Sequence, residues 1–223
     1  MLPRKAPGIP APAKVLLTGF DAFGGESLNP SWLAVKALHG RQVLGHAVVA
    51  AQLPTVFDES LIALDALLKK HQPALVICVG QAGGRSALSL ERVAINVNDA
   101  RIADNAAAQP IDTPVVSGGP AAYFTTLPIK AMLAALLQEG IDVEVSQTAG
   151  TFVCNHVFYG LMHALATKRT LRHARGGFVH VPFLPEQGTP NMALEEMVRG
   201  MRLAVRCALQ TREDQLLGAG ATH

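Results

Sequence analysis

Apolar residues follow two alternating patterns along the chain: short continuous runs and longer stretches with helical spacing. Continuous runs, such as residues 74–79, are typical of strands buried on both faces of a sheet. Stretches such as residues 59–70 instead place their leucines on one helical stripe, with lysines at the carboxyl end, where the helix dipole favours cations. The alternation predicts an α/β sheet with helices on both faces.

The expected strands cover residues 15–17, 43–53, 74–79, 92–97, 143–146 and 177–181. The expected helices cover residues 31–38, 59–70, 128–139, a segment after residue 154, and 190–209. Residues 98–123 lack clear periodicity, and unpatterned loops of that length are usually functional or ordered by a partner.

No linker or internal repeat divides the chain. We therefore expect a single-domain three-layer α/β/α fold with a mostly parallel twisted sheet, forming one catalytic domain over residues 15–210. The proline-rich residues 1–14 are expected to form a flexible tail, and residues 211–223 a C-terminal tail.

Composition excludes several classes of function. The chain has 223 residues, of which 49% are hydrophobic and 16% charged, with a formal net charge of +2. Disordered chains are poorer in apolar residues, and no basic stripe is available to neutralise phosphates, so nucleic acid is not an expected partner. Residues 113–129, a long uncharged stretch, are broken by prolines and glycines, so no membrane span is expected. The apolar excess instead suggests surface buried between subunits.

The three cysteines are widely spaced and fit neither a disulfide framework nor a metal-binding pair. Together with the lack of a signal peptide, this favours a cytoplasmic protein in a reducing compartment. Glycine-rich segments at 19–25 and 80–84 follow strands, where phosphate-binding loops occur, but neither has the spacing of a nucleotide motif. No cofactor or metal is expected, and both segments are also compatible with plain turns.

Cys154 is the cysteine whose position suggests chemistry. It follows a turn containing Gly150 and opens an apolar helical stripe. A thiol at a helix N-terminus has a lowered pKa, and the free N–H groups there can stabilise an oxyanion. A structural role is the alternative for Cys154, and it is the expected role of Cys78 and Cys207, which lie among apolar residues.

A thiol nucleophile needs a base, and the chain has eight histidines. His156 lies two residues beyond the thiol on the same expected helix, so its side chain points to a different side. His180 lies in an otherwise apolar strand that Pro182 ends. It is therefore a candidate base, with a satisfied core histidine as the alternative.

The carboxylate that would orient this base is less evident from the sequence. Alternation along residues 91–97 places Glu91 on the same face as Val93 and Ile95, where a carboxylate needs a buried partner such as His180. The alternative is a strand-end glutamate that lies in solvent or pairs with Arg92.

Several blocks of the sequence together resemble the pyroglutamyl peptidase I family, also called pyrrolidone-carboxylate peptidases. The blocks are TGFDAFGG at 18–25 with Asn-Pro at 29–30, GQAGGR at 80–85, ERVAIN at 91–96, DARI at 99–102, AGTFVCN at 149–155 and HVPFLP at 180–185. They occur in the family's order and span nearly the whole chain. In the first block, Asp21-Ala22 stands where the family has Glu-Pro.

The resemblance implies removal of N-terminal pyroglutamyl residues from peptides through a thioester, without metal or cofactor. It makes Cys154 the nucleophile, His180 the general base and acid, Glu91 the residue that orients the imidazole, and Arg101 a support for the oxyanion. The substrate pocket would be lined by Phe20, Phe23, Gln81, Phe152 and Val153. Family members are often homo-oligomers, so a dimer or tetramer is expected.

Two other functions remain open from the sequence. A glutamine amidotransferase-like enzyme would also use cysteine, histidine and glutamate, but it would carry a Gly-x-Cys-x-Gly elbow, and residues 151–155 read TFVCN. A non-catalytic α/β ligand-binding protein could keep the pocket and have lost turnover. For Phe20 and Phe23, ordinary core packing is the alternative role.

Overall fold

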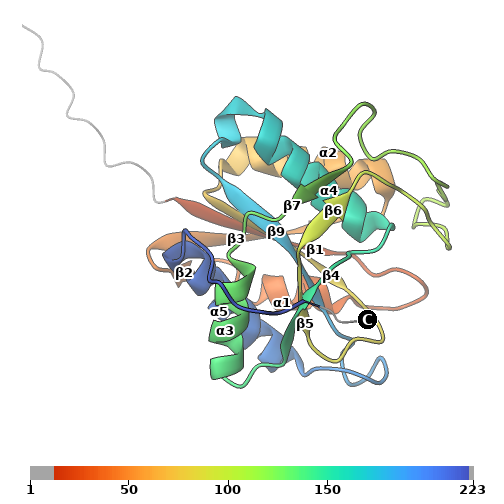
Figure 1. Cartoon of the computed structure of the whole chain (residues 1–223). Helices are drawn as coiled ribbons and strands as arrows, with labels where there is room; N and C mark the ends of the chain where they lie inside the picture. The colour runs from red at the N-terminus through yellow and green to blue at the C-terminus, as the bar shows by residue number, and fades with distance from the viewer. Residues whose placement is uncertain (1–12, 221–223) are drawn as a thin grey trace, which may run out of the picture.

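The computed structural model describes residues 13–220 and has a three-layer α/β/α architecture (Figure 1). The middle layer is a seven-stranded sheet in the order β2-β3-β1-β4-β9-β5-β8. Its strands are β1 (Lys14–Phe20), β2 (Gln42–Val43), β3 (His46–Leu53), β4 (Leu75–Gln81), β5 (Leu88–Glu91), β8 (Val143–Ser146) and β9 (Arg175–Val181). Four of its six strand pairings are parallel, which confirms the expected mostly parallel sheet.

Helices cover both faces of this sheet. They are α1 (Pro30–Lys36), α2 (Phe57–His71), α3 (Ile129–Gln138), α4 (Val153–Thr167) and α5 (Leu194–Gln210), with a 3-10 turn η1 at Arg169–Leu171. In the view of Figure 1, α2 and α4 lie above the sheet and α1, α3 and α5 below it. The predicted helix positions are confirmed, with small shifts at their ends.

Two hydrophobic cores explain the continuous apolar runs. In β1, Val15 and Leu17 face the core shared with α1, α3 and α5, whereas Leu16 faces the core shared with α2 and α4. Successive side chains of a strand point to opposite faces, so a central strand must be apolar at every position. All three of these residues are fully buried.

Two predicted strands were wrong in their extent. The strand expected at 43–53 is an antiparallel hairpin of β2 and β3, because Leu44 and Gly45 form a tight turn with positive φ values of 50° and 76°. The strand expected at 92–97 is the shorter β6 (Val93–Ile95), which pairs with β7 (Ala122–Phe124) in a separate two-stranded sheet, and the main-sheet strand before it, β5, ends at Glu91. Glu91 therefore does not share a strand face with Val93.

The last helix begins at Leu194 rather than at residue 190. Residues just before it are held by the segment that follows β9, because Met192 N–H donates to the Phe183 carbonyl at 2.9 Å and Asn191 forms a bridge with Phe183. This backbone pairing competes with helix formation and delays the helix start.

The predicted N-terminal tail lies almost entirely outside the described residues, since residues 1–12 are not described and β1 begins at Lys14.

After α5, the chain crosses to the start of α3. There the Asp214 carboxylate accepts hydrogen bonds from the N–H groups of Lys130 and Ala131. Since α3 has no cap of its own, this carboxylate supplies one. Among residues 13–220, no helix is long and apolar enough to cross a membrane.

Candidate active site

Cys154 is the second residue of α4, at the edge of the sheet where β4 and β9 end. The helix start is fastened to the small sheet by Asn155. Its side-chain amide accepts from Ile95 N–H at 3.0 Å and donates to the Ile95 and Val97 carbonyls at 2.9 and 3.0 Å. This asparagine is fully buried, so its hydrogen bonds hold the start of α4, and with it the neighbouring Cys154, in a fixed position.

The thiol lies directly over Gly80 of β4. A Cβ atom added to Gly80 would come within 2.7 Å of Cys154 Sγ and 2.9 Å of Phe178 Cζ. Gly80 is paired in register with His180 of β9, and the Phe178 and His180 rings lie 4.9 Å apart on the face toward α4. The missing side chain at Gly80 therefore makes room for the sulfur on the sheet face that carries the His180 ring.

His180 is buried and is held by Glu91. Its Nδ1 atom is 2.7 Å from Glu91 Oε1, with 4% of the histidine and none of the glutamate exposed. The alternative of a solvent-facing Glu91 paired with Arg92 is not observed; Arg92 Nε instead donates to Gln147 Oε1. A hydrogen bond at Nδ1 leaves Nε2 for proton exchange with a nucleophile.

Arg85 is a site residue that the sequence reasoning did not assign. Its Nη1 atom lies 2.7 Å from Glu91 Oε1, the same oxygen that binds His180, and its Nη2 donates to the Thr148 carbonyl at 3.2 Å. It thus connects the buried carboxylate with the loop that leads into α4. The sequence signal for Arg85 was its place in the GQAGGR block, which also contains the predicted pocket residue Gln81.

The pKa of the Cys154 thiol is raised to about 12, mainly by burial and then by the Glu91 charge, with the Arg85 charge acting in the opposite direction. The expectation of a pKa lowered by the helix N-terminus was therefore wrong in direction, because desolvation of the thiolate outweighs the dipole. The thiol is protonated at neutral pH, so a nucleophilic sulfur requires transfer of its proton to a neighbouring base.

An aromatic slot opens beside the thiol. It is lined by Phe20, Phe23, Asn29, Thr55, Gln81, Phe152, Val153 and Cys154, a set that contains all five predicted pocket residues. The Phe23 and Phe152 rings lie 6.2 Å apart, and the slot holds about 10 Å³ of open space, about one water molecule. A ring-shaped ligand therefore requires these phenyl groups to separate.

Asn29 and Thr55 are slot residues that the sequence reasoning missed. Both are tied to Asp21, whose carbonyl accepts from Asn29 Nδ2 at 2.9 Å and from Thr55 Oγ1 at 3.2 Å. The Asp21 carboxylate also accepts from Thr55 N–H at 2.7 Å. Asp21, which the resemblance singled out as a departure, is thus part of the framework of the slot. Asn29 was visible in the Asn-Pro block, whereas no sequence signal indicated Thr55.

Arg101 is exposed, in contrast to the other predicted site residues. It lies in the long unpatterned segment, two residues after Asp99, whose N–H donates to the Thr151 carbonyl at 3.0 Å and whose carbonyl accepts from Thr151 Oγ1 at 2.7 Å. These bonds fasten the segment to the loop before Cys154. The predicted role of Arg101 at the oxyanion stays a prediction.

His156 is buried and directed away from this chemistry. Its Nδ1 is 2.9 Å from Asn98 Oδ1, its Nε2 has no partner among the described residues, and the ring borders a separate cavity of about 370 Å³. Burial lowers the pKa of His156 from 6.5 to about 4, against the opposing charge of Asp58. The expectation that His156 is not the base for Cys154 agrees with this placement.

The low pKa of His156 makes stability depend on pH. As the pH falls below 6.5, His156 becomes protonated in the unfolded chain before it does so in the folded protein, which stabilises the unfolded state. Between pH 6.5 and pH 4 the free energy of unfolding should therefore drop by about 3 kcal/mol because of His156, and above pH 6.5 His156 should have no effect on it. Urea unfolding at pH 7 and pH 4 measures this change. His156→Gln should remove that part of the pH dependence, and His173→Gln, an exposed histidine, should not. An unchanged pH dependence in His156→Gln would contradict the assignment.

The close approach of Gly80 to the sulfur gives a second prediction. In Gly80→Ala the new methyl group must displace Sγ or the Phe178 ring, so turnover should fall by roughly 100-fold. Gly176→Ala is the matched control, since its Cβ would be equally crowded, 2.9 Å from the Val76 carbonyl, but far from the thiol. Both variants should lose stability, and only the first should lose activity in a steady-state assay below its melting temperature. Equal activity in the two variants would refute this role of Gly80.

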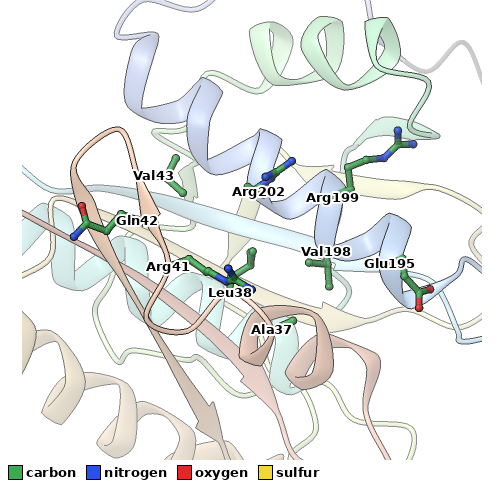
Figure 2. Close-up of a pocket in the computed structure, with 9 residues that line it drawn as sticks. All are labelled: Ala37, Leu38, Arg41, Gln42, Val43, Glu195, Val198, Arg199 and Arg202. Atoms are coloured by element: carbon green, nitrogen blue, oxygen red, sulfur yellow. The ribbon is translucent and has the colours of Figure 1, made fainter.

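A larger cavity lies elsewhere. It has a volume of about 610 Å³ and is bordered by α1, β2 and α5, with Arg41, Arg199 and Arg202 around it (Figure 2). It contains no cysteine or histidine, so it is not the catalytic centre. In the part of the chain that the structure describes, no group of acidic, histidine or cysteine side chains is arranged to hold a metal ion.

Comparison with known proteins connects this geometry to a family. A family model described as pyroglutamyl peptidase matches residues 13–211. The pyrrolidone-carboxylate peptidase of Cupriavidus taiwanensis is 58% identical over 214 residues, which cover 94% of this chain and 99% of the relative. The corresponding protein of Bacillus cytotoxicus is 53% identical with the same coverage.

Solved structures give the same result. The pyroglutamyl peptidase I of Bacillus amyloliquefaciens superposes with a TM-score of 0.90 at 49% identity, covering 93% of this chain and all of that one (100%). The pyrrolidone carboxyl peptidase of Thermococcus litoralis has a TM-score of 0.86 at 35% identity, covering 89% and 94% of the two chains. With its sequence, its fold and the cysteine beside a histidine–glutamate pair all in agreement, this chain belongs to the pyroglutamyl peptidase family.

Proposed function

We propose that the protein removes N-terminal pyroglutamyl residues from peptides, with Cys154 as nucleophile, His180 as general base and acid, and Glu91 as the group that orients the imidazole. The observation that carries this proposal is the buried 2.7 Å contact between His180 Nδ1 and Glu91 Oε1, next to a thiol that lines an aromatic slot. The arrangement is that of a nucleophile, a base and an orienting carboxylate.

In the first half of the reaction, the Cys154 proton passes to His180 Nε2 while Sγ attacks the pyroglutamyl carbonyl. Transfer during the attack is needed because the buried thiol is protonated at rest. The N–H groups of the first turn of α4 lack helical partners, so they are available to the developing oxyanion. The imidazolium, stabilised by Glu91, then protonates the leaving amine, and a thioester remains on Cys154.

In the second half, His180 takes a proton from a water molecule, which attacks the thioester carbonyl. The tetrahedral intermediate collapses, the sulfur leaves and recovers the proton, and free pyroglutamate is released. In both halves Glu91 orients the imidazole through Nδ1, and the Arg85 guanidinium lies 2.7 Å from the same carboxylate oxygen.

The slot matches the chemistry of a lactam. A pyroglutamyl residue has no ammonium group, so its site needs flat apolar walls and a few polar groups for one N–H and one carbonyl. Phe23 and Phe152 supply the walls, and Gln81 and Thr55 are the polar side chains available near the thiol. A site built on such hydrogen bonds rejects a prolyl residue, which lacks the lactam carbonyl.

The test is an assay with fluorogenic pyroglutamyl, prolyl and glutaminyl amides. The pyroglutamyl amide should be hydrolysed at least about 100-fold faster than the prolyl amide, because the slot's polar groups would be left without partners by proline. The glutamine amidotransferase-like alternative would release the glutaminyl amide faster. No release from the pyroglutamyl amide would refute the proposed function and favour a non-catalytic binding protein.

We also propose that the protein is a cytoplasmic homo-oligomer, a dimer or tetramer. The unpaired thiols of Cys78, Cys154 and Cys207 suit a reducing compartment, and exposed apolar side chains such as Ile62 and Phe124, each 70% exposed, are candidates for subunit contacts. Light scattering of the purified protein measures the assembly directly, and a monomer at micromolar concentration would refute this part.

A further inference from the structure

The side-chain amide of Gln187 makes several hydrogen bonds, and a bond from a backbone N–H shows which end of the amide is the oxygen. Gln187 lies in the loop after β9, and its Oε1 accepts from Leu184 N–H at 3.0 Å. A backbone N–H can only donate, so this bond identifies the oxygen end of the Gln187 amide. The Nε2 end therefore faces Gln81 Oε1 at 3.2 Å, Glu26 Oε2 at 3.4 Å and the Leu28 carbonyl at 3.5 Å.

The surroundings exclude the opposite orientation of this amide. Turning Gln187 around would place its oxygen against the Glu26 carboxylate and the Leu28 carbonyl, two groups that only accept. It would also bring its NH₂ group against the Leu184 N–H. One backbone donor and two acceptors thus fix which end of Gln187 meets Gln81.

The orientation of the Gln187 amide also fixes that of Gln81, which is the last residue of β4 and lines the slot. Its oxygen receives the Gln187 bond, so its NH₂ group is the end left to bind a ligand. Among the described residues, no protein acceptor is recorded for Gln81 Nε2. The slot therefore offers a hydrogen-bond donor at this position rather than an acceptor.

Building on the function proposed above, we propose that Gln187 is a specificity-determining positioning residue: it holds Gln81 so that the slot donates a hydrogen bond to the lactam carbonyl of the pyroglutamyl ring. A donor here favours a ring that carries a carbonyl over a prolyl ring, which has none. If Gln81 were reversed, its oxygen would face the lactam carbonyl, and two acceptors would be opposed. Gln187 touches no reacting atom and acts only through Gln81.

The sharpest test is Gln187→Glu. The new carboxylate still accepts from Leu184 N–H, so the loop is retained, but it can no longer donate to Gln81. Gln81 is then expected to turn its NH₂ group toward the carboxylate and its oxygen toward the slot. For the pyroglutamyl amide, KM should rise roughly 10- to 100-fold with a smaller change in kcat, and the preference over the prolyl amide should fall in parallel.

Three controls isolate the effect. Glu26→Gln in combination with Gln187→Glu removes the repulsion between neighbouring carboxylates, and the loss of preference should persist. Glu186→Gln, an exposed neighbour in the same loop, should behave as wild type. In a Gln81→Met background, Gln187→Glu should have no further effect on preference, because the residue through which it acts is gone. If Gln187→Glu fails to fold, Gln187→Met should also lower the preference, since Gln81 is then free to rotate.

Unchanged KM and preference in a folded Gln187→Glu variant, alongside an active wild type, would overturn this inference and leave the proposed function intact. An effect that persists in the Gln81→Met background would also overturn it. A wild-type protein without pyroglutamyl amidase activity would refute the proposed function and this inference together.

Discussion

Replacing Cys154 with alanine should abolish turnover, lowering kcat/KM by about 10⁵-fold or more, because the acyl group then has no atom on which to be carried. The melting temperature should change little, since the thiol is a small side chain beside a helix start secured by Asn155. Cys154→Ser should also lose most activity, because a hydroxyl group is harder to deprotonate in the same buried position. Steady-state kinetics with a fluorogenic pyroglutamyl amide and a thermal melt measure both effects.

The other two cysteines serve as matched controls. Cys78 is fully buried in β4, and Cys207 lies in α5 with its Sγ 3.8 Å from Thr211 Oγ1. Cys78→Ala and Cys207→Ala should lose some stability but keep their turnover. If activity were lost in Cys207→Ala and kept in Cys154→Ala, the nucleophile would have been assigned to the wrong thiol.

Glu91→Gln should lower kcat by about 10³- to 10⁴-fold with a much smaller change in KM. The amide occupies the same volume, but it carries no charge to stabilise the imidazolium that forms during attack. It also leaves the Arg85 guanidinium without its carboxylate partner, 2.7 Å away in the native site. Because Glu91 is fully buried, the variant should also be less stable, so kinetics must be recorded below its melting temperature.

Glu144→Gln is the control for this experiment. Glu144 lies on the neighbouring strand β8, where its Oε1 accepts from Ser89 Oγ at 2.8 Å, and it contacts neither His180 nor Arg85. It should keep wild-type kcat. A Glu91→Gln variant with near-normal kcat would mean that His180 needs no carboxylate and that the ion pair is structural only.

The order of strands and helices could be predicted from apolar periodicity because each buried face demands a regular pattern. The runs in β1 and β4 are apolar at every position since helices cover both faces of the sheet. The prediction failed where the local pattern continues across a change of sheet. Residues 92–97 alternate as one strand does, yet the chain leaves the main sheet at Arg92 and joins β7, a partner about 30 residues later. No local pattern encodes such a change.

Within the site, the resemblance to pyroglutamyl peptidases carried the prediction for the slot, since all five pocket residues that it assigned line it. Arg85, Thr55 and Gln187 were missed for a common reason. Each matters through a contact with a residue distant in the sequence or in a different loop, such as Gln187 with Gln81, 106 positions apart. A sequence pattern shows the chemical groups that a residue carries, whereas the roles of these three residues depend on which side chains and carbonyl groups they contact in the folded protein.

From the sequence alone, apolar periodicity predicts the layered α/β fold, and the blocks that resemble pyroglutamyl peptidases point to the reaction and to its candidate residues Cys154, His180 and Glu91. The periodicity is a local property of the chain, and the resemblance rests on short blocks of consecutive residues. The folded structure was needed to show that Glu91 binds both His180 and Arg85, that Cys154 lies over Gly80, and that burial raises the pKa of the thiol. The protonation state of the thiol depends on how much water and charge surround it, and those are set by segments that meet only when the chain folds.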